Sequence, residues 1–220
     1  MKEEIPATDG SILWANDNKT VFYVKKDPTT LREFQVYKHV LGTSSSKDEL
    51  LFEEKDERFY VYITKTLDKK FILIHSVSST SSETWLVAAD KPAEKALCFL
   101  KREKDHLYEI NHHENGFYIL TNKNSPNRKL VFSKSVPNSI DACEILIAHD
   151  PEVYIEDVEV YQAFLAVQSR KMGRTEIAVG NLDATNFSKI SMPEEVYELN
   201  FSFNENYASK EVHYHYTSLT

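Results

Sequence analysis

The amino-acid sequence predicts an all-β fold, a partial β-propeller of about four to five four-stranded antiparallel blades. Short runs rich in β-branched and aromatic residues alternate with polar turns along the chain, and helical periodicity is nearly absent. The first hairpin turns of successive units fall near Asn18, Asp68, Asn115, Gln162 and Glu205. They lie between about 43 and 51 residues apart, which is the length of a propeller blade. No linker rich in Gly, Ser or Pro interrupts the pattern, so we expect one incomplete propeller domain over residues 1–220.

The first unit shows how each strand is recognised. The runs Ile12–Asn16 and Thr20–Lys26 flank a turn of Asp, Asn and Lys, which predicts a β-hairpin. Pro28 fixes its own φ and disfavours a helical conformation for the residue before it, so the second strand ends there. The next run alternates between two faces, and a short outer strand follows a polar loop. We expect these strands at Phe34–Leu41 and Leu50–Glu54.

The same plan repeats along the rest of the chain. The second unit is expected to have strands at Phe59–Lys65, Phe71–Ser79, Glu83–Ala89 and Ala96–Lys101. The third is expected to have them at Leu107–His113, Phe117–Asn122, Lys129–Ser135 and Cys143–Asp150. The fourth is expected to have them at Val153–Val160, Phe164–Lys171, Thr175–Asn181 and Phe187–Pro193, and a fifth begins with Tyr197–Phe203 and Glu211–Thr217. An antiparallel sandwich or a set of stacked sheets is the structural alternative.

Composition and charge exclude several classes of function. The chain has 26 basic and 34 acidic residues and a formal charge of -8, which disfavours a nucleic-acid partner. No apolar run approaches the ~20 residues needed to cross a bilayer, and the acidic N-terminus has no signal-peptide core, so we expect no membrane partner. Cys98 and Cys143 are the only cysteines and lie in separate predicted strands, which does not indicate a disulfide framework. These features predict a cytoplasmic location.

Histidines are the first candidates for chemistry. His213 and His215 lie two apart on a predicted strand and would share a face, and a metal site would need a third ligand such as Glu211. A surface or cross-strand pair explains them better. The neighbours His112–His113 would face opposite sides of a regular strand, so these two and His106 are predicted to have structural roles.

Charged runs give two further candidates. Glu53–Arg58 could receive a basic peptide, but we predict a solvated connection between blades. Arg170–Arg174 is a basic hairpin tip, and one such tip in an acidic chain does not indicate nucleic-acid binding.

Two serine-rich runs and two tryptophans are the last residues that we consider for a functional or packing role. The runs Ser44–Ser46 and Ser78–Ser82 are rich in hydroxyls, but no base and orienting acid accompany them in a recognisable motif, so we predict loops. Trp14 and Trp85 are predicted to pack between sheets. The sequence therefore leads us to assign no catalytic, cofactor-binding or metal-binding residue, and no cofactor.

Several spaced stretches carry a family pattern. The two longest read WANDNKTVFYVKKDPTTLREFQVYKHVLGT and DELLFEEKDERFYVYITKTLDKKFILIHSVSSTSSETWLV. Two shorter ones follow, REKDHLYEINHHENGFYILTN in the middle and VHYHYTSLT at the end. Together they resemble the N-terminal propeller of oligopeptidase B, a branch of the prolyl oligopeptidase family of serine peptidases. The pieces occur in the family's order, and the resemblance runs almost from Ser11 to Thr220.

The resemblance also implies a part that these residues do not contain. In that family a peptidase domain follows the propeller and carries a nucleophilic serine on a G-x-S-x-G elbow, then an aspartate and a histidine. No G-x-S-x-G occurs here, since none of the five glycines lies four residues from another. We therefore expect an internal portion of a seven-bladed propeller, about four and a half blades, with the peptidase domain and the earliest blades absent.

The function that the resemblance implies is indirect. The whole enzyme would cut short peptides after Lys or Arg, and the propeller would cap the active site and exclude folded proteins. The expected partners are the missing α/β-hydrolase peptidase domain, short basic peptides by way of the parent enzyme, and a second copy through exposed blade faces. The alternative is a free-standing propeller that binds a protein or peptide with its loops. Both hypotheses predict no peptidase activity for this chain alone.

Overall fold

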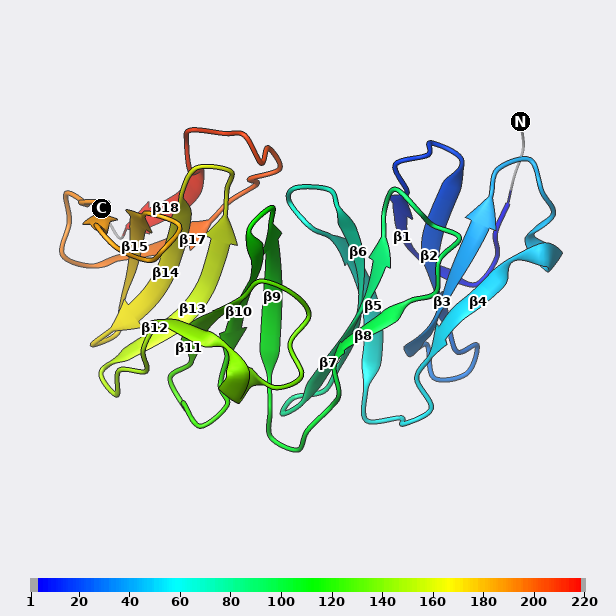
Figure 1. The fold of residues 1–220 in the computed structure, drawn as a ribbon, viewed down its shortest axis with the longest axis horizontal. Coiled ribbons are helices and arrows are strands. Elements are labelled where there is room, and N and C mark those ends of the chain that lie inside the picture. The colour runs from blue at the N-terminus through cyan, green and yellow to red at the C-terminus, as the bar shows by residue number, and fades with distance from the viewer. Residues whose placement is uncertain (1–3, 219–220) are drawn as a thin grey trace. The chain divides into compact units, whose positions relative to one another are not determined.

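The computed structural model describes residues 4–218, which consist almost entirely of antiparallel strands (Figure 1). Strands β1 to β18 form four four-stranded sheets and one two-stranded sheet. The helical elements in this range are two short 3-10 turns, Ser45–Lys47 and Ile140–Ala142. Neither is long and apolar enough to span a bilayer. The predicted all-β class is therefore confirmed.

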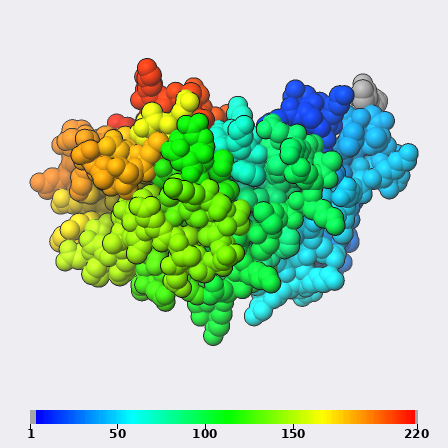
Figure 2. All heavy atoms as spheres, in the orientation of Figure 1, coloured from blue at the N-terminus to red at the C-terminus, as the bar shows by residue number. Residues whose placement is uncertain are grey.

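The chain divides into two compact units, and the first ends at His106. Its strands are β1 (Thr8–Trp14), β2 (Thr20–Lys26), β3 (Glu33–Val40), β4 (Glu49–Glu53), β5 (Tyr60–Lys65), β6 (Phe71–Val77), β7 (Ser82–Ala88) and β8 (Leu97–Leu100). Each sheet takes four strands in chain order, so hairpins or short loops make every connection within it. Apolar side chains of both sheets form one core, which includes Phe22, Val24, Val61, Ile72 and Ile74. Figure 2 shows side chains filling the gaps that Figure 1 leaves between the ribbons of these sheets.

The second unit begins at Leu107 and repeats this arrangement. Its strands are β9 (Tyr108–His113), β10 (Gly116–Thr121), β11 (Lys129–Ser133), β12 (Glu144–Ile147), β13 (Val153–Val160), β14 (Leu165–Lys171), β15 (Arg174–Gly180), β16 (Ser188–Lys189), β17 (Tyr197–Phe201) and β18 (Tyr214–Ser218). The sheets β9–β12 and β13–β16 share a core that includes Tyr118, Leu130, Ile155, Val158 and Leu165. The pair β17–β18 forms the two-stranded sheet.

One strand that differs from the prediction is β18, which begins at Tyr214 rather than Glu211. The Asn204 side chain is the physical reason. Its amide donates hydrogen bonds to the carbonyls of Ser202 and His213, at 3.1 and 2.9 Å, and its carbonyl oxygen accepts one from the His213 backbone at 2.7 Å. A side chain thus occupies the position of a backbone partner, and regular pairing starts only after His213.

Two other predictions were wrong in detail. β16 covers two residues rather than the predicted Phe187–Pro193, because pairing continues only to a bond from the Ile190 amide and Pro193 has no amide hydrogen to donate. Trp14 is 43% exposed, because its neighbour Leu13 faces the core and successive side chains of a strand face opposite ways. Trp85, in contrast, packs against the core of the first unit as predicted.

Candidate functional site

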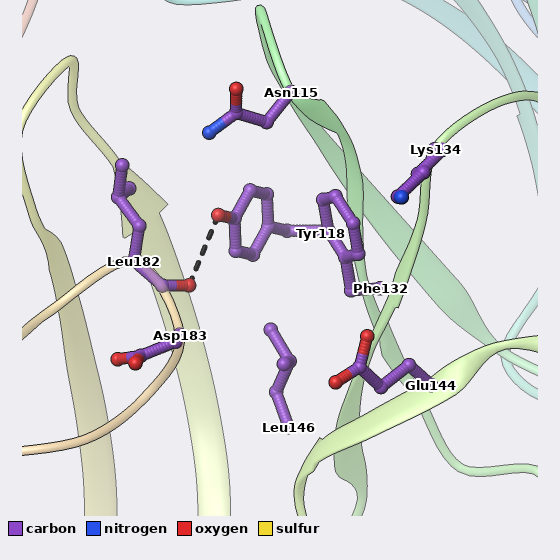
Figure 3. A pocket seen from close by; sticks show the side chains of 8 residues that line it. All are labelled: Asn115, Tyr118, Phe132, Lys134, Glu144, Leu146, Leu182 and Asp183. Carbon is purple, nitrogen blue, oxygen red and sulfur yellow. Dashed lines mark hydrogen bonds between the residues drawn. The ribbon is translucent and has the colours of Figure 1, made fainter.

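A row of three side chains crosses the sheet β9–β12 and forms the floor of a cavity in the second unit. Tyr118 on β10 pairs with Phe132 on β11, and Phe132 pairs with Glu144 on β12. Paired residues of an antiparallel sheet point to the same face, so the three side chains lie side by side. The rings of Tyr118 and Phe132 meet edge to face, with centroids 5.1 Å apart. Lys134 and Leu146 extend this floor (Figure 3).

The opposite wall comes from the loop that joins β15 to β16. Leu182 and Asp183 line the cavity there, and Asn115 lines it from the β9–β10 turn (Figure 3). The Tyr118 hydroxyl donates a hydrogen bond to the Leu182 carbonyl at 3.0 Å. Asp183 accepts hydrogen bonds from the amide and hydroxyl of Thr185, at 3.2 and 2.6 Å, which hold the loop in shape. The volume of this open cavity is about 370 Å³, within the range of small-molecule sites.

The titratable groups of this cavity differ in burial and in whether they have a hydrogen-bond or ion-pair partner. Burial raises the pKa of Tyr118 to about 12, with Tyr207 and Asp183 adding to the shift, so Tyr118 stays a neutral donor near pH 7. Lys134 and Glu144 are exposed. Neither side chain has a hydrogen-bond or ion-pair partner among residues 4–218. The cavity therefore offers an aromatic floor beside one unpaired cation and one unpaired anion, which can each pair with a charged group of a ligand.

A second cavity, of about 520 Å³, lies among loops of the first unit. The predicted serine-rich loop Ser78–Ser82 contributes to it, and its hydroxyls stabilise the loop. Ser78 Oγ accepts hydrogen bonds from the amides of Thr80 and Ser81, at 3.4 and 3.1 Å. Ser81 Oγ accepts one from the Asp105 amide at 3.1 Å. The loop prediction is confirmed up to Ser81, and β7 begins at Ser82.

The acidic run Glu53–Arg58 is only partly the solvated connection that we predicted. Glu54 is 6% exposed and forms an ion pair with Arg102, and the Ser76 hydroxyl donates to it at 2.5 Å. The Arg102 guanidinium also lies 3.5 Å from the centre of the Phe59 ring. Sequence reasoning missed this pair because Arg102 is 48 residues away, and only the packing of the sheet β1–β4 against the sheet β5–β8 brings it close.

The carboxyl pKa of Glu54 reflects competing effects. Burial alone raises it, but hydrogen bonds from Arg102, Ser76 and the Asp56 amide outweigh burial and lower it below 4.5. Glu54 therefore remains charged near pH 7 and serves to hold the first unit together.

The two exposed histidines lie at the end of the second unit. His213 precedes β18, with Nδ1 3.3 Å from the Phe203 carbonyl and Nε2 3.9 Å from Glu211. His215, on β18, lies 3.1 Å from the Thr217 hydroxyl. No three His, Cys, Asp or Glu side chains gather within metal-binding distance in the described part of the chain.

The other three histidines considered from the sequence also have separate surroundings. His113 is buried, accepts a hydrogen bond from the Asn115 amide at 3.0 Å and lies 3.2 Å from the Gln162 carbonyl. His112 packs against the Phe117 ring, with centroids 4.7 Å apart. His106 belongs to the first unit and is also buried.

The basic tip Arg170–Arg174 is largely neutralised by its own sheet. Arg170 forms an ion pair with Glu156 at 2.6 Å, and Lys171 forms one with Glu152 at 3.3 Å. A hairpin with two of its three cations already paired does not present the concentrated positive charge of a nucleic-acid site.

None of the cavity residues in Figure 3 was singled out from the sequence. Tyr118, Phe132 and Glu144 come from three different strands, and only the register of the sheet places them in one row. The one available signal was that Lys134 and Glu144 are charged residues beside apolar strands. That signal is too common to identify a site without the pairing.

Comparisons with known proteins agree with the fold. The family described as the prolyl oligopeptidase N-terminal beta-propeller domain matches residues 1–220. Dipeptidyl aminopeptidase BI of Pseudoxanthomonas mexicana is 31% identical over 100% of this chain and 30% of that protein. Protease 2 of Moraxella lacunata is 30% identical over 96% of this chain and 30% of that protein. The chain thus spans about a third of the length of these relatives.

Solved structures give the same result. Oligopeptidase B from Leishmania major superposes with a TM-score of 0.91 and 27% identity, over 99% of this chain and 32% of that one. Oligopeptidase B from Trypanosoma brucei, in a closed form with covalently bound antipain, gives a TM-score of 0.90 and 28% identity over 98% of this chain and 32% of that one. The predicted partial propeller and the resemblance to oligopeptidase B are both confirmed. The chain belongs to the family of prolyl oligopeptidase N-terminal β-propeller domains.

Proposed function

We propose that the chain is a non-catalytic part of the propeller of an oligopeptidase B-like serine peptidase. The parent enzyme would cleave short peptides after Lys or Arg, in the cytoplasm, with an α/β-hydrolase domain that carries the serine, aspartate and histidine. The observation that supports this proposal is the match to Leishmania major oligopeptidase B over 99% of the chain with a TM-score of 0.91.

The physical role of the propeller in this proposal is steric. Each unit is built on a continuous apolar core and on four-stranded sheets whose strands follow chain order, so each unit is a closely packed scaffold. A rigid cover over a hydrolase site would admit only peptides that are small and flexible. Selection by size would then come from the propeller, and selection for Lys or Arg from the hydrolase domain.

A chimera tests this function. The matching segment of Leishmania major oligopeptidase B would be replaced by residues 1–220, with the unaltered parent as control. We expect the chimera to cleave an arginine amide at least about ten-fold better than the matched alanine amide, and to leave a folded protein intact. The ratio of kcat/KM values for the two amides, and the digestion of the folded protein, are the measurements.

Two results would contradict the proposal. A chimera that folds with native strand content but digests folded protein would remove the steric role. A folded chimera with no turnover, together with an independent peptide or protein partner for the 220-residue chain, would favour the free-standing binding module instead.

We also propose self-association through the two-stranded sheet. Phe203 is 84% and Tyr214 38% exposed, and β18 pairs only with β17 among residues 4–218. An open strand edge beside exposed aromatic rings favours pairing with a second copy. Sedimentation velocity over a range of concentrations should show a dimer that Phe203→Ser weakens. Met172→Ser is the control, since Met172 is 91% exposed on a distant hairpin of the same unit. Equal association of both variants and the unaltered chain would exclude this edge.

A further inference from the structure

The cavity on the sheet β9–β12 has charged groups that are not used by the fold. Lys134 follows the end of β11, and Glu144 begins β12, directly opposite Phe132. They flank the aromatic floor on the same side of the sheet and are more than 4 Å apart, since no ion pair joins them within the described chain (Figure 3). An unpaired cation and an unpaired anion across an apolar floor complement a ligand that carries both charges on an apolar stem.

The second carboxylate decides which kind of ligand fits. Asp183 lies on the opposite wall, and only one of its two oxygens is engaged, by Thr185. The cavity therefore offers two carboxylates and one ammonium group. A ligand with one carboxylate and one delocalised or mobile cation matches this balance better than a dicarboxylate or a neutral molecule does.

We propose that this cavity binds a terminal arginine or lysine, whose carboxylate pairs with Lys134 and whose cationic head pairs with Glu144 and Asp183. The aliphatic stem would lie on Phe132 and Leu146, as the stems of Lys and Arg do on apolar surfaces. A guanidinium above the face of the Phe132 ring would gain a cation–π contact as well.

Size and hydrogen bonding limit the ligand further. A volume of about 370 Å³ is at the lower end for ligand sites, which suits one long side chain with its carboxylate rather than an extended segment. The Asn115 side chain lines the mouth, where its amide could donate to the carbonyl of a preceding residue. Two kinds of ligand carry this carboxylate, apolar stem and cationic head. One is the free amino acid, and the other is a peptide that ends in Arg or Lys. Only the interpretation of such a peptide as a cleavage product rests on the proposed function.

Chemical-shift titration of the isotope-labelled 220-residue chain tests the site without any enzymatic activity. The probes are N-acetyl-arginine, its amide without the carboxylate, N-acetyl-norleucine without the cation, free arginine and the peptide Ala-Ala-Arg. We expect N-acetyl-arginine to shift the amide signals of Asn115, Glu144 and Leu182. The amide should bind about five-fold more weakly, since it loses the exposed charge pair with Lys134, and the norleucine compound at least about five-fold more weakly, since it loses the pairs with Glu144 and Asp183.

Variants assign the two charges to the two residues. Lys134→Gln should weaken N-acetyl-arginine about five-fold but leave its amide unchanged. Glu144→Gln should weaken N-acetyl-arginine similarly but leave N-acetyl-norleucine unchanged. Lys189→Gln is the control, since Lys189 is an exposed lysine of the same unit that pairs with Glu176. Because Lys134 and Glu144 have no partner within residues 4–218, neither substitution should alter the dispersion of the spectrum.

The comparison of Ala-Ala-Arg with free arginine identifies the source. Tighter binding of the peptide supports a peptide terminus, and tighter binding of free arginine supports the amino acid. Shifts that are the same for all five probes, or that the Lys134 and Glu144 variants leave unchanged, would overturn the site. This result is independent of the chimera, so either proposal can fail while the other stands.

Discussion

Replacing Arg102 with alanine is expected to destabilise the first unit by about 3–5 kcal/mol. Arg102 forms an ion pair with Glu54, donates to the Ser76 hydroxyl at 2.8 Å, and packs on the Phe59 ring. Glu54 is 6% exposed, so the substitution leaves a carboxylate in the interior with only the Ser76 hydroxyl and a backbone amide as partners. Removing one member of a buried pair costs far more than the pair itself contributes, because the remaining charge cannot regain its hydration.

Arg58→Ala is the matched control for this prediction. Arg58 forms an ion pair with Asp56 at 2.6 Å, but its side chain is 82% exposed, so its removal should change the urea midpoint little. Equal midpoints for the Arg58 and Arg102 variants would show that the buried pair does not stabilise the fold.

The same pair gives a pH dependence with a definite sign. The folded-state pKa of Glu54 lies below its ordinary value of 4.5, so the charged carboxylate stabilises the folded chain. This contribution is fully present above pH 4.5 and is lost as the pH falls below 4.5 towards the folded-state pKa. The unaltered chain should lose stability over this range, and Glu54→Gln should lose less.

Much of the fold could be predicted because each strand carries its own signal. The alternation of apolar residues and the turns of Asn, Asp and Gly placed the strands of the first four units, most of them to within two residues, since both signals act over a few neighbours. Before β18 the prediction failed because the Asn204 side chain takes the place of a backbone partner. A side chain that takes the place of a backbone hydrogen-bond partner does not change the pattern of apolar and polar residues, so the sequence gives no sign of it.

The candidate site could not be predicted for a different reason. Tyr118, Phe132 and Glu144 are separated along the chain by 14 and 12 residues, and their meeting depends on the register of two strand pairs. A shift of one residue in either pair would send a side chain to the other face. The ion pair of Glu54 and Arg102 could not be predicted either. The sequence shows Glu54 within a run of charged residues that is typical of a surface, and only the folded structure shows that this side chain is buried against Arg102.

Gly116→Ala is expected to destabilise the second unit by about 3–5 kcal/mol, through backbone strain and overlap together. Gly116 begins β10 with a φ of +144°, a conformation that side chains rarely adopt. A Cβ there would lie 2.4 Å from the Ser133 carbonyl oxygen and 2.8 Å from Lys134 Cα, so the backbone of β11 would have to move. Thermal unfolding of the 220-residue chain measures the effect.

Gly173→Ala separates the two causes. Gly173 also has a positive φ, of +80°, but a Cβ there would meet nothing within 4 Å, so only the strain of about 1–2 kcal/mol remains. The difference between the two variants therefore reports the close approach of β10 to β11. That approach also positions Phe132 and Lys134 in the cavity, so Gly116→Ala should weaken N-acetyl-arginine binding and Gly173→Ala should not. Equal losses of stability in both variants would mean that β11 moves at little energetic cost to accommodate the added Cβ. The floor of the cavity would then not be the rigid surface that ligand binding requires.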